Sequence, residues 1–232
     1  IDSTAMLCRA PSNAAGTVAV EVTMNGHDFT TSGAAFEYYP AVTLASVSPR
    51  MGPMSGNTVV EVYGSGFVDS PLLACRFGKL ALAPAVFKSS SHLTCVTPAM
   101  AAGIQGVEVT TNGADFSTNS LQFYSVEPIT IDAISPVSGP ERGGTMVTVT
   151  GGPFTAPEAI VCEFGSAAYR VPATWLSEGA VACPSPAHEP ASTEIRLSTN
   201  GQQFVVSPIA FEFQHVSVVR SVYPSSGTLL GG

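Results

Sequence analysis

The same residue types recur along this chain at intervals of 87 or 88 residues. Cysteines, asparagine–glycine pairs and prolines all keep this spacing, at Cys8, Cys95 and Cys183, at Asn25-Gly26, Asn112-Gly113 and Asn200-Gly201, and at Pro49, Pro136 and Pro224. Solenoid repeats run about 20–50 residues, so this period is too long for a stacked repeat. It suits a small domain with its own core, and 232 residues then hold about two and a half copies.

Within one period, short β-branched stretches alternate with turn residues. In the copy from Ala41 to Val126 these stretches are Thr58–Tyr63, Leu73–Gly78, Leu80–Phe87, His92–Cys95, Val107–Thr111 and Leu121–Tyr124. The opening Val47-Ser48-Pro49 adds one more, ending in a proline- and glycine-built turn. Asn112-Gly113 is a strong hairpin signal. About seven short strands without a helical period predict an all-β, immunoglobulin-like sandwich.

Equivalent positions in the copies predict which side chains are buried. Apolar residues alternate with polar ones such as Glu61 and Thr148, and this period of two indicates one buried and one solvated face. The predicted core positions are Val60 and Val62 with Val147 and Val149; Val107 and Val109 with Val20 and Val22 and with Ile195 and Leu197; Phe67 with Phe154; Phe87 with Trp175; and Phe36 with Phe123 and Phe211.

Five cysteines give an odd number, which the repeat explains. Each complete copy carries two, Cys75 with Cys95 and Cys162 with Cys183, and Cys8 is the second cysteine of a copy that begins upstream. A structural disulfide within each copy is the favoured interpretation. The alternatives are a buried reduced pair and a metal site, and no CxxC motif or histidine cluster supports the metal. Disulfides would place the chain outside the cytosol.

Taken together, the motifs of the copies resemble the IPT/TIG family of immunoglobulin-like domains. The resemblance rests on the openings Val47-Ser48-Pro49, Ile134-Ser135-Pro136 and Val222-Tyr223-Pro224 with the glycines that follow them, up to Gly231-Gly232; on Gly64-Ser65-Gly66-Phe67; on Cys75-Arg76-Phe77-Gly78 and Cys162-Glu163-Phe164-Gly165; and on Cys8 to Pro11, Cys95 to Pro98 and Cys183 to Pro186. One departure is Gly151-Gly152-Pro153-Phe154, where proline replaces the second glycine of the motif.

The resemblance divides the chain into four parts. Residues 1–40 are the C-terminal part of one IPT/TIG domain, 41–126 and 127–214 are complete domains, and 215–232 are the start of a further one. The chain is therefore expected to be a segment of a longer protein. The junctions are short and β-branched, unlike a flexible Gly/Ser linker. We expect Val126, Ile129 and Ile131 to pack between modules and the modules to form an elongated, semi-rigid rod.

Charge and residue content narrow the function. A net charge of -8 disfavours binding to nucleic acid or to an anionic membrane surface, because either would require a basic face on the protein. No apolar run is long enough to insert into a membrane. His27, His92, His188 and His215 do not recur in register, and no nucleophile-elbow GxSxG is present. We expect no catalytic, metal-binding or cofactor-binding residues and no cofactor.

Two further motifs bear on ligands and glycans. Asp28 and Asp115 follow the first two Asn-Gly pairs, and Gln203 takes that place in the third, so a solvated turn is favoured over a calcium site. No asparagine stands in an N-glycosylation motif, so any glycans are expected to be O-linked, with candidates at Ser89-Ser90-Ser91, Thr43 and Thr130.

Two functions fit, both extracellular or at the cell surface. The family resemblance implies tandem arrays such as receptor stalks of the plexin and Met type and giant surface proteins. The first hypothesis is a structural rod segment of a filament, sheath or surface coat that self-associates. The second is a receptor or adhesion ectodomain that binds a protein partner. The second should show one module with an exposed aromatic or arginine cluster that the other lacks, and Tyr169 and Arg170 are the candidates.

Overall fold

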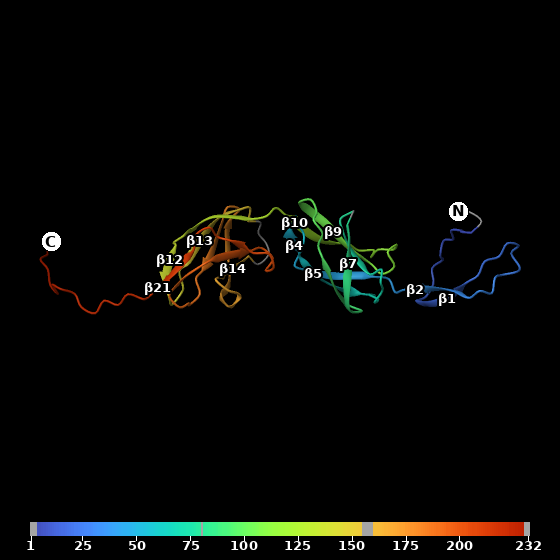
Figure 1. Ribbon diagram of the computed structural model, residues 1–232, viewed down its shortest axis with the longest axis horizontal. Helices are drawn as coiled ribbons and strands as arrows, with labels where there is room; N and C mark the ends of the chain where they lie inside the picture. The colour runs from blue at the N-terminus through green and yellow to red at the C-terminus, as the bar shows by residue number, and fades with distance from the viewer. Residues whose placement is uncertain (1–3, 80, 155–159, 230–232) are drawn as a thin grey trace. The chain divides into compact units, whose positions relative to one another are not determined.

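The computed structural model describes residues 4–79, 81–154 and 160–229, and Leu80 and the closing Gly231-Gly232 of the family motif lie outside them. The described chain is built from β-strands, with one short 3₁₀ helix, and divides into two compact units that separate near residue 125 (Figure 1). The expectation of an all-β, immunoglobulin-like fold is confirmed.

The N-terminal part forms a two-stranded antiparallel hairpin of β1 (Gly16–Val20) and β2 (Ala34–Tyr38). Val20 and Phe36, which the repeat predicted to be buried, are 42% and 43% exposed. Their equivalents in the complete modules are fully buried, so this prediction is wrong for the N-terminal copy. Within the described residues, the hairpin has no second sheet packed on its apolar face.

The first complete module contains eight strands in the order β3-β5-β8-β7-β6-β9-β10-β4. Their bounds are β3 (Thr43–Ser48), β4 (Met51–Pro53), β5 (Val59–Ser65), β6 (Ala74–Phe77), β7 (Ala81–Ser89), β8 (His92–Val96), β9 (Gly103–Thr110) and β10 (Leu121–Val126). Strand β7 changes partner at Pro84: the residues up to Pro84 pair with β6, and those from Ala85 pair with β8. A single strand thus closes one edge of both sheets of the sandwich.

The second complete module repeats this arrangement with more breaks in its strands. Its strands are β11 (Thr130–Ser135), β12 (Ser138–Pro140), β13 (Met146–Gly152), β14 (Val161–Phe164), β15 (Arg170–Pro172), β16 (Thr174–Ser177), β17 (Ala180–Pro184), β18 (Ala191–Thr193), β19 (Ile195–Ser198), β20 (Val205–Val206) and β21 (Phe211–Gln214). Strands β15 and β16 together take the place of β7, pairing with β14 and β17 respectively. The 3₁₀ helix η1 (Ala167–Tyr169) lies where the repeat carries its extra residue.

The two cores are built from equivalent positions. Most of the predicted core residues in these modules are fully buried, namely Val60, Val62, Phe67, Val107, Val109 and Phe123 in the first module and Val147, Val149, Phe154, Ile195, Leu197 and Phe211 in the second. Phe154 is buried although proline precedes it, so the departure from the family motif leaves the core intact. Phe87 only packs against its core from a half-buried position, and Trp175 is 44% exposed, so its assignment to the core is wrong.

Ile129 and Ile131 belong to the core of the second module and are 8% and 7% exposed. The expectation that they pack between modules is therefore corrected. The reason can be read from the repeat, because they stand 87 residues after Val42 and Leu44, which are buried in the first core. Val126 is only half-buried.

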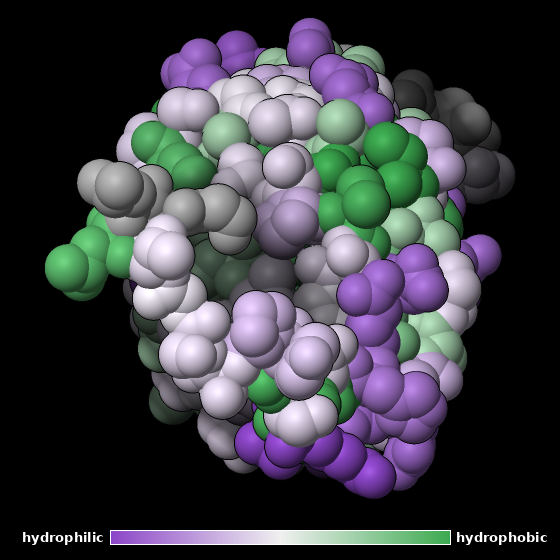
Figure 2. Space-filling model, turned by 90° about the vertical axis from the view of Figure 1, so that its left-hand side faces the viewer, coloured by the Kyte–Doolittle hydropathy of each residue, from purple (hydrophilic) through white to green (hydrophobic). Residues whose placement is uncertain are grey.

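Apolar residues also reach the surface. On the face shown in Figure 2, green apolar residues form several separate groups between hydrophilic ones. Scattered exposed apolar side chains are ordinary for soluble domains. They do not by themselves mark a binding site.

Candidate functional site

Each complete module is cross-linked by one disulfide between its two sheets. Cys75 on β6 is joined to Cys95 on β8 with a Cα–Cα distance of 6.2 Å, and Cys162 on β14 is joined to Cys183 on β17 at the same distance. All four cysteines are at most 1% exposed. These are the pairings that the repeat predicted. Cys8 is exposed and free in the described part of the chain.

The three Asn-Gly loops share one hydrogen-bond pattern. In the first complete module, Asn112 Oδ1 accepts from the backbone amides of Ala114 and Asp115 at 3.0 and 2.8 Å, and Asn112 Nδ2 donates to Asp115 Oδ2 at 2.9 Å. The amide of Gly113, with φ of 75°, donates to Thr110 Oγ1. This φ suits glycine, which has no Cβ to clash.

The same pattern holds the loops around Asn25 and Asn200. Asn25 Nδ2 donates to Asp28 Oδ2 at 2.7 Å, and Asn200 Nδ2 donates to Gln203 Oε1 at 2.6 Å. In the third copy the side-chain amide oxygen of Gln203 thus accepts the hydrogen bond that a carboxylate oxygen accepts in the first two copies. The aspartates of the first two copies serve the loop itself, in line with the solvated-turn interpretation.

The first module carries a cross-strand ion pair on one sheet. Arg76 on β6 lies opposite Glu108 on β9, and its Nε and Nη2 both donate to Glu108 Oε2. The guanidinium carbon of Arg76 lies 3.5 Å from the ring centroid of Phe116. Cation–π contacts of this kind favour a fixed guanidinium orientation. Leu82, opposite Arg76 on β7, completes the row and is 55% exposed.

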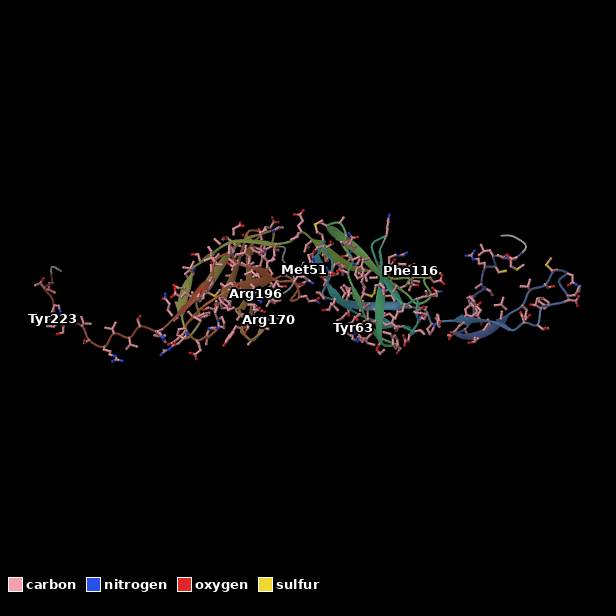
Figure 3. All side chains as sticks on the ribbon, viewed as in Figure 1. Met51, Tyr63, Phe116, Arg170, Arg196 and Tyr223 are labelled. Atoms are coloured by element: carbon pink, nitrogen blue, oxygen red, sulfur yellow. A yellow bond between two sulfur atoms is a disulfide. The ribbon has the colours of Figure 1, made fainter. Side chains whose placement is uncertain are left out.

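In the second module the three equivalent positions on neighbouring strands carry different charges. Glu163 on β14 lies between Arg170 on β15 and Arg196 on β19. Arg170 Nε donates to Glu163 Oε2 at 2.8 Å, and Arg196 Nη1 donates to Glu163 Oε1 at 3.4 Å. The Glu163 side chain is only 5% exposed, while the arginines are 43% and 38% exposed. We call Arg170, Glu163 and Arg196 the arginine row; both of its arginines are labelled in Figure 3.

Two further residues contact the arginine row. The guanidinium carbon of Arg170 lies 4.6 Å from the ring centroid of Phe204, and Arg196 Nη2 donates to Glu194 at 3.1 Å. A buried carboxylate needs this kind of pairing, because an isolated buried charge is strongly unfavourable. Glu163 therefore fixes both arginines while leaving them partly exposed.

The sequence contains a signal for the arginine row. Tyr169 and Arg170 were predicted, but Glu163, Arg196 and Phe204 were missed. In the repeat, Arg76 corresponds to Glu163 and Glu108 to Arg196, so the charges at two equivalent positions are exchanged. Reversed signs at two positions of one alternating pattern indicate that the two residues lie opposite one another on neighbouring strands.

The histidines have separate structural roles. His92 pairs with Glu61 and stacks on Tyr63, His188 lies 4.4 Å from Tyr169 and 4.7 Å from Phe213 between ring centroids, and His215 pairs with Glu141. His27 lies in the exposed Asn25 loop.

Other chemistry is sparse in the described residues. They contain no group of three or more His, Cys, Asp or Glu side chains that could hold a metal, and no helix long and apolar enough to cross a membrane. The Glu37 carboxylate beside Tyr39 raises the pKa of that phenol.

Comparisons with known proteins identify chains of similar sequence and fold. The chain is 30% identical over 124 residues to Plexin-A3 of Rattus norvegicus, covering 49% of this chain and 6% of the relative. It is 29% identical over 204 residues to Fibrocystin-L of Mus musculus, covering 83% of this chain and 4% of the relative. The solved full extracellular region of Plexin A4 matches with a TM-score of 0.50 and 17% identity, over 84% of this chain and 18% of that one. The chain thus spans only a small part of its relatives' length.

These findings agree with the disulfides, which form and persist outside the cytosol. The segment is extracellular or exposed at the cell surface. The model of the IPT/TIG domain matches residues 43–125 and 128–213, which is most of the chain. The chain therefore belongs to the IPT/TIG domain family.

Proposed function

We propose that this segment is part of the ectodomain of a cell-surface receptor or adhesion protein and binds a protein partner without catalysis. The observation that carries the proposal is the arginine row. It gives the second module two half-exposed arginines, of which Arg170 lies over an aromatic ring, whereas the first module has Leu82 in the place of Arg170. Arginine and aromatic side chains are the usual anchors of protein interfaces.

The comparisons support the receptor hypothesis over the filament hypothesis. Several relatives are named plexins, and one of the solved structures that match is a plexin extracellular region. The rod with stiff junctions stays a prediction. Its proposed physical basis is weaker than expected, because Ile129 and Ile131 are buried within one module.

The absence of catalysis is also a proposal. It is supported by the structural partners of the histidines and by the use of Asp28 and Asp115 within their own loops. The modules share their buried core positions, whereas the charges at the partly exposed positions of Arg76 and Glu108 are exchanged in the second module. That pattern suits a scaffold whose surface, rather than a cleft, is adapted for binding.

Fractionation of the native protein from its cells tests the proposal. A receptor ectodomain should remain with membranes, dissolve in mild detergent and sediment as discrete particles. A filament or sheath should pellet after detergent extraction and show a regular repeat in electron micrographs. A pelleting, regularly repeating polymer would overturn the receptor assignment and restore the structural one.

A further inference from the structure

We propose that the arginine row is a docking site for a protein partner and that Arg170 binds a carboxylate of that partner. This inference rests on the proposed receptor function and adds the chemistry of the partner. A guanidinium with free terminal nitrogens recognises a carboxylate through two parallel hydrogen bonds, which gives both energy and orientation.

Arg170 is arranged for such a contact. Its Nε is bound to Glu163, and its terminal nitrogens form no hydrogen bond with the described residues. The guanidinium is held on the ring of Phe204, and the side chain is 43% exposed. Because the side chain is already ordered, a partner would not have to supply the entropy cost of fixing it.

Arg196 extends the site. Its Nη1 is bound to Glu163, and its Nη2 is bound to Glu194, whose side chain is 59% exposed. An exposed ion pair contributes little stability, so a carboxylate of the partner can replace Glu194 at small cost. Val206 lies opposite Arg196 on β20 and is 47% exposed, which offers apolar contact beside the charges.

The charges favour a protein carboxylate over a sulfated glycan. The two arginines are balanced by Glu163 and Glu194, and the whole chain carries a net charge of -8. A long polyanion is attracted by an extended basic surface, which this site lacks. A single carboxylate in a partly desolvated interface needs only local complementarity.

The first module cannot offer the same contact. Arg76 directs both its Nε and its Nη2 to Glu108, and the position of Arg170 is taken by Leu82. This difference supplies a matched control within one chain, because the resonances of Arg76 report any non-specific effect of an acidic ligand.

Titration of the 232-residue chain with a capped short peptide of alternating glutamate and serine tests the inference, with arginine side-chain NMR as the readout. We expect saturable shifts of the Arg170 signals, with those of Arg76 unchanged. Arg170→Leu should weaken binding roughly tenfold or more, which corresponds to the loss of a charge-assisted hydrogen-bond pair.

Further variants separate binding from folding. Glu194→Gln should strengthen binding severalfold, because it frees Arg196 and removes a negative charge, and a folding defect could not do this. Lys88→Gln, an exposed charge change in the first module, should leave binding unchanged. The inference is overturned if the peptide causes no shift at Arg170, or if a heparin oligosaccharide binds there and the acidic peptide does not. Either result leaves the membrane fractionation, and hence the receptor proposal, unaffected.

Discussion

Arg76 and Glu108 face each other across β6 and β9 as an ion pair, and the second module carries this pair with the signs reversed, as Glu163 and Arg196. Arg76→Glu should destabilise the first module by about 1 kcal/mol, because it replaces a cross-strand attraction with a repulsion. The double variant Arg76→Glu with Glu108→Arg should recover most of the loss. Urea unfolding measures both, and a double variant as unstable as the single one would contradict the equivalence of the two pairs.

The disulfides should each stabilise one module. Replacing Cys75 and Cys95 by alanine opens a loop with a sequence separation of 20 residues and should cost the first module about 3 kcal/mol on the chain-entropy account. The unfolding transition of the second module should stay in place. Cys8→Ala is the control and should change neither transition. Non-reducing peptide mapping checks the pairing directly, and a link between Cys95 and Cys162 would refute the modular assignment.

The stability that the Asn-Gly loops contribute should depend on the asparagine and not on the charge of the aspartate. Asn112→Ala removes an acceptor for two backbone amides and a donor to Asp115, and should cost about 1–2 kcal/mol. Asp115→Gln should be neutral to within about 0.5 kcal/mol, because Gln203 fills this place in the second module. Thermal unfolding of both variants is the measurement. An equal loss in both would show that the carboxylate is needed, as in an ion-binding loop.

Ile131 should stabilise the second module itself. Ile131→Ala removes a side chain that is 7% exposed in the core and should cost about 2–4 kcal/mol. Trp175, the single tryptophan of the chain, reports unfolding of this module by fluorescence. Val126→Ala, at a half-buried position, is the control and should cost less. An unchanged unfolding midpoint in Ile131→Ala would contradict the placement of Ile131 in the core of the second module.

Much of the fold could be predicted because the repeat supplies an internal alignment. It identified the cysteine pairs, the alternating core of Val60 and Val62, and the all-β class. It failed where burial depends on more than local pattern. Phe36 is exposed because no second sheet covers its hairpin in the described residues, and Trp175 is exposed although it is equivalent to the half-buried Phe87.

The candidate site was harder to predict. Arg170 was predicted as a candidate contact residue, but its role depends on Glu163 and Arg196, which are distant from each other in sequence and meet only through strand pairing. The stacking of Arg170 on Phe204 depends on side-chain positions, which a sequence pattern does not specify.

A receptor ectodomain requires these modules to lie outside the cell. The chain has two lysines, Lys79 and Lys88, and both are exposed. A membrane-impermeant amine-reactive biotin reagent, applied to intact cells that make the native protein, should label both lysines, as peptide mass spectrometry would show. Labelling that appears only after the cells are permeabilised would contradict the assignment of this segment to a cell-surface ectodomain.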